Sequence, residues 1–201
     1  MFRHPQKYRV SNSRLFMAVT LSFAILTGSF FLDGAAVRLR HMIRTPELTA
    51  AMRTITSLGS LGILVLVVAS TYVVGLSSVR DDGRRTALVA ALALLVTGLC
   101  VLVLKFVTAR SNDGQFNFFW EWNPGAMFFP SGHAAMVCAV SVVFGRVYRS
   151  LRWPLVVIVL AVAISRIYLN HFFSDVIAGL LLGLVCSSLI VSTMGRTFWP
   201  S

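Results

Sequence analysis

The sequence predicts an all-α membrane protein that crosses the bilayer six times. Two observations predict this fold class. Of the 201 residues, 57% are hydrophobic and only 12% are charged, whereas soluble domains carry about 25% charged residues. The apolar residues are also gathered in long runs, each about as long as an α-helix must be to cross the hydrocarbon core. No separate soluble domain is expected.

The first element is a span over residues 15–32, preceded by a polar, basic segment over residues 1–14. A cleaved signal peptide is the rival interpretation of such a start. It would require a shorter apolar core and a small-residue cleavage site, and Asp33-Gly34-Ala35-Ala36 matches such a site poorly. We therefore expect an uncleaved first helix.

Residues 35–57 mix four arginines with apolar side chains. Thr45-Pro46-Glu47 is typical of a helix start, with threonine as the cap and proline at the first position. Two interpretations remain open. The segment forms one or two short helices in the plane of the membrane interface, or it is a solvated loop.

Five further apolar runs complete the predicted bundle, and a short basic turn over residues 79–85 follows the first of these runs. The runs are residues 58–78, 86–108, 131–147, 153–169 and 172–194. The loop over residues 109–130 is rich in phenylalanine and tryptophan, which favour the headgroup level, so it is expected on the membrane surface. The spacing of Gly179 and Gly183 is typical of close helix contacts, here with another span of the same chain.

The distribution of positive charge predicts the orientation. Six spans place both termini on one side, which carries eleven of the 18 lysines and arginines. By the positive-inside rule that side, including the tail over residues 195–201, is cytoplasmic, and we expect a bacterial inner-membrane protein. The net charge of +11 is explained by orientation and by attraction to anionic lipid rather than by nucleic-acid binding.

Ionisable side chains recur at the outer, extracytoplasmic ends of spans three to six. They are Lys105, His133, Arg166, His171 and Asp175. Ionisable residues at this depth mark a functional site by default. His171 and Asp175 are four apart and share a helix face, and a carboxylate on one ring nitrogen leaves the other free to attack or accept a proton. Taken alone, this pair also fits a structural ion pair.

The segment Pro130-Ser131-Gly132-His133 begins the fourth span. Ser131 is the expected N-cap, and the free N–H groups of a first helical turn bind phosphate readily. Gly132 allows an anion to approach the backbone closely. His133 is placed to give a proton to a departing oxygen.

These groups together suit phosphoryl transfer. Lys105 and Arg166 supply fixed positive charge for the phosphate oxygens, His171 supplies the nucleophile and His133 supplies the acid. No metal and no cofactor are required by this set.

The same residues resemble the three-part signature of the type 2 phosphatidate phosphatases, a family within the vanadium-haloperoxidase-related acid phosphatase superfamily. The resemblance is carried by Lys105, by Pro130-Ser131-Gly132-His133, and by Ser165-Arg166 followed by His171-x3-Asp175. It implies that His171 forms a phosphohistidine, that Asp175 orients it and that His133 protonates the leaving group. The implied phosphate-binding residues are Lys105, Arg110, Ser131, Gly132 and Arg166.

Two positions depart from the family pattern. The first motif places Arg-Pro where this chain has Asn112-Asp113. Arg110 matches an arginine that many members carry, but on a continuous helix it would point about 140° away from Lys105, so it replaces the missing arginine only if the helix ends first. The third motif is one residue shorter between Arg166 and His171, which predicts a tight turn.

The expected function is metal-independent hydrolysis of a membrane lipid phosphate monoester or diphosphate. Phosphatidate, phosphatidylglycerol phosphate, polyprenyl diphosphate and lipid A are all compatible with the sequence. Three alternatives remain: a phosphotransferase with the same chemistry, a lipid-phosphate-binding protein with impaired catalysis, and a transporter. The sequence predicts no oligomeric state.

Overall fold

The protein is described from a computed structural model, which describes residues 12–77, 82–108, 110–111, 114–116 and 127–198. The helices are α1 (Asn12–Ile43), α2 (Pro46–Ser57), α3 (Leu61–Leu76), α4 (Asp82–Thr108), α5 (Gly132–Val147), α6 (Arg152–Tyr168) and α7 (Phe173–Phe198), with a 3-10 turn at Arg149–Leu151. Only an isolated bridge between Arg110 and Phe116 interrupts this helical pattern within the described residues. The predicted all-α class is confirmed.

Some sequence predictions fall on residues outside this description. They concern most of the basic segment at 1–14, residues 79–81 of the basic turn, the aromatic residues at 117–126, Asn112-Asp113 and the last three residues of the tail. Those predictions stay predictions.

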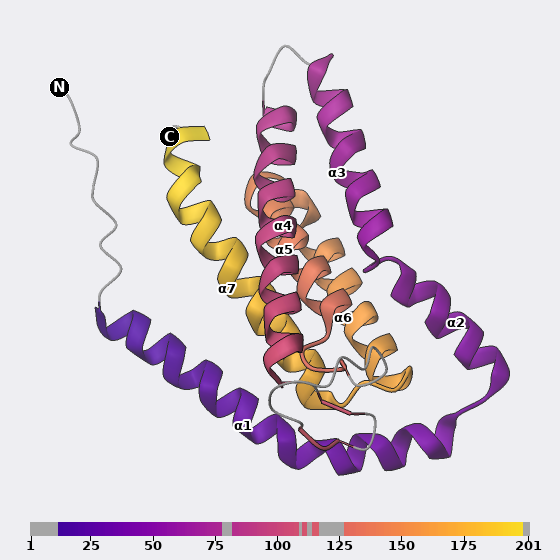
Figure 1. Ribbon diagram of the computed structural model, residues 1–201. Coiled ribbons are helices and arrows are strands. Elements are labelled where there is room, and N and C mark those ends of the chain that lie inside the picture. Colours follow the sequence, from indigo (N-terminus) through magenta and orange to yellow (C-terminus); the bar gives the residue numbers. More distant parts are fainter. Residues whose placement is uncertain (1–11, 78–81, 109, 112–113, 117–126, 199–201) are drawn as a thin grey trace.

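Helix α5 is the centre of the bundle, and α4, α6 and α7 pack around it (Figure 1). Its alanines at 134, 135 and 139 are fully buried, which lets neighbouring backbones approach closely. A Cβ at Gly179 of α7 would overlap the carbonyl oxygen of Ser131, and one at Gly183 would overlap that of Ala135. The predicted role of this glycine pair in close helix packing within the chain is therefore confirmed.

Gly183→Ala is expected to destabilise the bundle, because its new methyl group would meet backbone that cannot turn aside. Overpacking of this kind costs about 1–3 kcal/mol, which corresponds to a melting temperature lowered by roughly 2–10 °C. Thermal denaturation in detergent measures it. The matched control is Gly98→Ala in α4, where a Cβ meets nothing within 4 Å; an equal loss in both variants would contradict the close-packing argument.

The prediction of six spans is only partly supported by helix length. Among the described residues, four helices are long and apolar enough to cross a membrane: Thr20–Ile43, Asp82–Thr108, Arg149–Tyr168 and Phe173–Met194. The pair α2 and α3, bent by 41°, makes a fifth candidate if counted as one broken span. Helix α5 has 16 residues, about 24 Å, and lies inside the ring formed by the others.

The first helix is longer than predicted. It does not end at residue 32 but continues through Asp33 and Gly34 to Ile43, because one glycine costs a helix only about 1 kcal/mol and Asp33 finds polar partners. Helix α1 runs obliquely to the bundle, and its second half passes the ends of α4 and α7 (Figure 1). Residues 35–57 are not one separate interfacial unit, since they divide between α1 and α2.

The predicted start of α2 is confirmed. Thr45 is the N-cap, its hydroxyl accepts a hydrogen bond from the N–H of Leu48, and Pro46 is the first helical residue. Tyr168 at the end of α6 accepts from the N–H of Thr45 at 3.2 Å. This contact ties the turn between α1 and α2 to the end of α6, where the candidate site lies.

Candidate active site

The turn between α6 and α7 places His171 beside Arg166. Asn170 has φ of 87°, a left-handed conformation that asparagine tolerates better than most residues. The N–H of His171 then bonds back to the carbonyl oxygen of Arg166 at 3.0 Å, which is the Schellman arrangement at a helix end. The predicted tight turn is thus a standard helix C-cap, and it needs only four residues between arginine and histidine.

The start of α7 places Asp175 on the other side of the same imidazole. Asp175 is the third residue of α7, and its Oδ2 accepts from the N–H of Phe172 at 3.0 Å, as the acid of a capping box does. Oδ2 also lies 3.4 Å from Nδ1 of His171, which is an ion-pair distance rather than a formed hydrogen bond. Asp175 is fully buried and His171 is 5% exposed.

The contacts of His171 assign its tautomer. Nε2 lies 2.5 Å from Nη2 of Arg166, and a guanidinium can only donate, so Nε2 is the acceptor and carries the lone pair. The proton of the neutral ring is then on Nδ1, which faces Asp175. Burial lowers the pKa of His171, and Arg166 and Lys105 lower it further, while Asp175 acts in the opposite direction. The ring is therefore held as a neutral base with Nε2 directed at a cation.

The beginning of α5 faces the same region. The N–H of Ser131 donates to the carbonyl oxygen of Asp175 at 2.9 Å, which docks the two helix starts together. Ser131 occupies the predicted N-cap position, but its hydroxyl makes no capping hydrogen bond; it is completely buried and without a partner in the structure. A buried hydroxyl of this kind needs an acceptor, and the free N–H groups of the first turn of α5 lie next to it.

The remaining predicted residues converge on this point. The charges of Arg166 and Lys105 and the ring of His171 act electrostatically on His133. The ammonium group of Lys105, in the last turn of α4, donates to the carbonyl oxygen of Met127. Lys105, His133 and Arg166 are each partly buried, whereas His171 and Asp175 lie deeper.

A residue outside the sequence prediction supports His133 from behind. Gly59 lies in the break between α2 and α3, and a Cβ there would be 3.3 Å from the Cβ of His133 and 2.9 Å from a methyl group of Val162. The break therefore packs directly on the candidate acid. Nothing in the sequence pattern marked this glycine apart from the others.

Arg110 contacts two carboxylates rather than the imidazole of His171. Helix α4 ends at Thr108, before Arg110, so the side chain of Arg110 is free of the helical direction and turns inward. Its Nη1 donates to Oδ1 of Asp175 at 2.7 Å, and its Nη2 donates to Oδ2 of Asp33 at 2.8 Å. Four per cent of the residue is exposed. The structure places Arg110 behind the His171–Asp175 pair, where its guanidinium is already occupied by two carboxylates.

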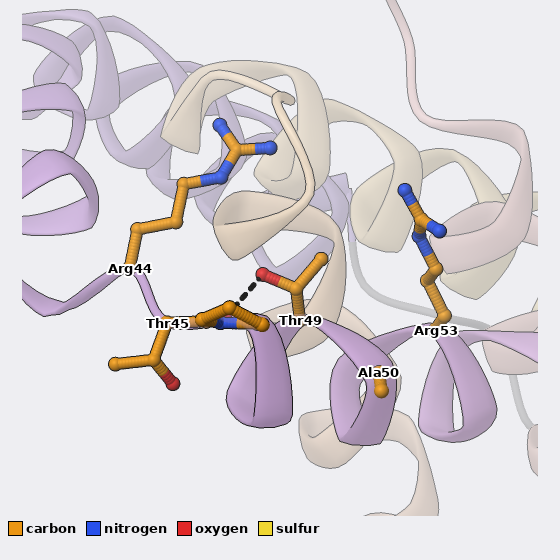
Figure 2. A pocket seen from close by; sticks show the side chains of 6 residues that line it. Arg44, Thr45, Thr49, Ala50 and Arg53 are labelled. Carbon is orange, nitrogen blue, oxygen red and sulfur yellow. Dashed lines mark hydrogen bonds between the residues drawn. The ribbon is translucent and has the colours of Figure 1, made fainter.

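Two hollows adjoin the site. An apolar groove of about 790 Å³ between α3 and α4 is lined by side chains of both helices and ends at Lys105. A smaller pocket of about 410 Å³ lies at the start of α2, where Arg44 and Arg53 point the same way on either side of Thr49 (Figure 2). Arg44 also reaches the side-chain oxygen of Asn170 at 3.4 Å, one residue from His171.

The sequence of the chain matches a known protein family. The model of the PAP2 superfamily matches residues 86–199, more than half of the chain. The chain belongs to the PAP2 superfamily. The match begins in α4 and includes every candidate site residue from Lys105 to Asp175, whereas α1, α2 and α3 lie outside it.

Two solved structures share the PAP2 fold of this chain. One is the transmembrane PAP2-type phosphatidylglycerolphosphate phosphatase from Bacillus subtilis, with 23% identity, a TM-score of 0.63, and 90% of this chain and 96% of that chain covered. The other is LpxE from Aquifex aeolicus, with 23% identity, a TM-score of 0.64, and 80% and 95% covered. No curated protein sequence matches the chain. With its long apolar helices, the chain is a multi-pass membrane protein of the PAP2 superfamily.

Proposed function

We propose that the protein is a membrane phosphatase that hydrolyses a lipid phosphate monoester or diphosphate through a phosphohistidine at His171. The observation that carries the proposal is the orientation of this ring, with Nε2 facing the guanidinium of Arg166 and Nδ1 facing Asp175. A neutral imidazole so held is a nucleophile aimed at the place where an anion would sit. Membership of the PAP2 superfamily supports the same class of enzyme.

The proposed reaction has two displacements. In the first, the Nε2 lone pair of His171 attacks phosphorus, the bond from phosphorus to the ester oxygen breaks, and protonated His133 gives its proton to that oxygen. In the second, neutral His133 takes a proton from water, the water oxygen attacks phosphorus, and the bond from phosphorus to Nε2 breaks. Inorganic phosphate leaves and both histidines return to their initial states.

The phosphate is held by groups that converge from three helices. Arg166 would turn from Nε2 to the phosphate oxygens, where Lys105 adds a second positive charge. The unpartnered hydroxyl of Ser131 and the N–H groups following Gly132 would bind the remaining oxygens. Arg110, which the sequence predicted as a phosphate ligand, is better suited to hold Asp175, because Asp33 and Asp175 occupy its guanidinium.

Two features favour an amphipathic substrate. The apolar groove between α3 and α4 reaches Lys105, so a hydrocarbon chain in the groove would bring its headgroup to the site. The pocket between Arg44 and Arg53 supplies positive charge for a neighbouring anionic group. We place the site at the periplasmic face of a bacterial inner membrane, following the charge distribution along the chain.

Release of phosphate from a panel of lipid phosphates in detergent tests the proposal. The panel contains phosphatidate, phosphatidylglycerol phosphate, a polyprenyl diphosphate and lipid A, and glycerol is added to detect transfer to an alcohol. Inhibition by orthovanadate is expected, since it mimics phosphate at such a site. Binding of these lipids without any turnover would instead support the lipid-binding alternative, and passage of substrate across vesicles without hydrolysis would support a transporter.

The pH dependence follows from the lowered pKa of His171, whose ordinary value is about 6.5. The nucleophile is active when neutral, so activity is lost as the pH falls through the lowered pKa; the need for protonated His133 sets a separate alkaline limb. We expect the acid limb of kcat/KM to lie below pH 6.5. Protonation of the substrate also produces an acid limb, because a phosphate monoester gains a proton near pH 6. The profile is therefore measured with both an alkyl and an aryl phosphate. An acid limb above pH 6.5 with both substrates would contradict a buried neutral His171.

A further inference from the structure

Asp33 is a buried acid in the middle of α1, far in sequence from every residue of the PAP2 match. It is 7% exposed, and an ionised carboxylate in apolar surroundings is costly unless it is paired and hydrogen-bonded. Its Oδ1 accepts from the N–H of Ser174 at 2.8 Å, and its Oδ2 accepts from the Ser174 hydroxyl at 2.6 Å and from Arg110. Asp33 thus binds the residue directly before Asp175.

Arg110 joins this acid to the catalytic pair. Nη1 donates to both the Ser174 hydroxyl and Oδ1 of Asp175 at 2.7 Å, while Nη2 donates to Asp33. The guanidinium is further fixed by Nε donating to the carbonyl oxygen of Gly114 at 3.3 Å and by the ring of Phe172 at 4.0 Å. One buried cation is therefore shared by two buried carboxylates, of which only Asp175 faces His171.

The charge balance of this chain of contacts has a chemical consequence. If Arg110 were paired with Asp175 alone, its positive charge would offset the carboxylate that raises the basicity of His171. A second carboxylate on the far side of the guanidinium offsets that cation instead. Among the residues that the structure describes, the other charged or titratable groups that act on His171 are Arg166 of α6, Lys105 of α4 and His133 of α5, and the two cations oppose its protonation.

We propose that Asp33 is a positioning residue for the reaction: through Arg110 and Ser174 it holds Asp175 against His171 and keeps the negative charge of Asp175 available to the imidazole. The inference rests on the proposed function. It gives helix α1, which lies outside the family match, a direct part in setting the nucleophile. It also gives a reason for a buried acid at a position where an apolar side chain would stabilise the helix more simply.

Asp33→Asn tests the proposal, because it keeps the shape and an acceptor for Ser174 but removes the charge. We expect kcat on a lipid phosphate to fall about 10- to 100-fold, as for other residues that orient a catalytic group through a partner, with little change in KM. The acid limb of the pH profile should move to lower pH, since the imidazolium loses a stabilising negative charge. Asp33→Glu should retain more activity than Asp33→Asn.

Arg110→Gln supplies the opposite charge change. Removal of the cation should move the acid limb to higher pH, and the double variant with Asp33→Asn should return it toward the wild-type position. The same substrate is used throughout, so its own titration cancels. The matched control is Asp82→Asn, an exposed acid at the other end of α4, about 35 Å from Lys105 along the helix, which should leave the profile unchanged.

The outcomes separate the two proposals. A wild-type chain without phosphatase activity refutes the proposed function. An active wild type whose acid limb is the same in Asp33→Asn, Arg110→Gln and the double variant refutes the role of Asp33, because a purely structural role lowers stability and activity without moving the limb. Melting temperatures in detergent are measured for each variant, and if Asp33→Asn does not fold, Asp33→Ser, which also removes the charge, replaces it in the single and the double variant.

Discussion

His171→Ala is expected to reduce phosphate release by at least about 10⁴-fold, the scale of loss when a covalent nucleophile is removed. The variant has no atom at the place of Nε2, so neither the attack on phosphorus nor the intermediate is possible. The fold should persist, because the backbone N–H of residue 171 still bonds to Arg166 and the lost ring leaves only a small cavity. Initial rates on the best lipid of the panel measure the effect.

The control for this variant is His41→Ala, an exposed histidine of α1 with no place in the site. It should keep wild-type activity. Phosphate release by His171→Ala at more than one per cent of the wild-type rate, in protein that melts at the wild-type temperature, would remove His171 from the role of nucleophile.

His133→Ala is expected to slow hydrolysis of an alkyl lipid phosphate by about 10²- to 10⁴-fold, the usual contribution of a general acid. An alkoxide is a poor leaving group and needs the proton. A p-nitrophenyl ester leaves without one, so its first displacement should remain fast while the second, which uses His133 as base, becomes slow. A burst of one p-nitrophenol per enzyme, followed by slow turnover, is the expected signature.

The burst distinguishes this role from damage to the pocket. If His133 only shaped the site, both esters would lose activity alike and no burst would occur. Gly59→Ala provides a second comparison, because its methyl group would press on the backbone and Cβ of His133. It should lower activity on the alkyl ester more than on the aryl ester.

The sequence predicted the parts of the fold and site that follow from local pattern. Long apolar runs predicted the helices, and the ends of those runs predicted that Lys105, Arg166 and Asp175 would meet at one end of the bundle. The start of α2 at Thr45 followed from capping chemistry. The role of Asn170 could also have been inferred, since asparagine just after a helix is a known left-handed cap.

The rest depended on contacts between distant segments. Asp33 was considered only as part of a poor cleavage site, although an isolated acid after an apolar run is itself a sign of function; its partners, Arg110 and Ser174, are 77 and 141 residues away. Arg110 was assigned to the phosphate because its position along the chain matched a family pattern, and spacing cannot show which way a side chain turns after a helix ends. The extension of α1 to Ile43 was likewise not predicted, because the apolar run ends at Asp33-Gly34.

Rapid-quench labelling tests the central claim most directly. His133→Ala is mixed with radiolabelled aryl phosphate, stopped in alkali, in which phosphohistidine is stable, and digested for peptide mapping by mass spectrometry. Close to one phosphate per chain on His171, and none in the His133→Ala/His171→Ala double variant, is the predicted result. Label on Ser131 or on any other residue, or a burst of p-nitrophenol with no label on the protein, would contradict nucleophilic attack by His171.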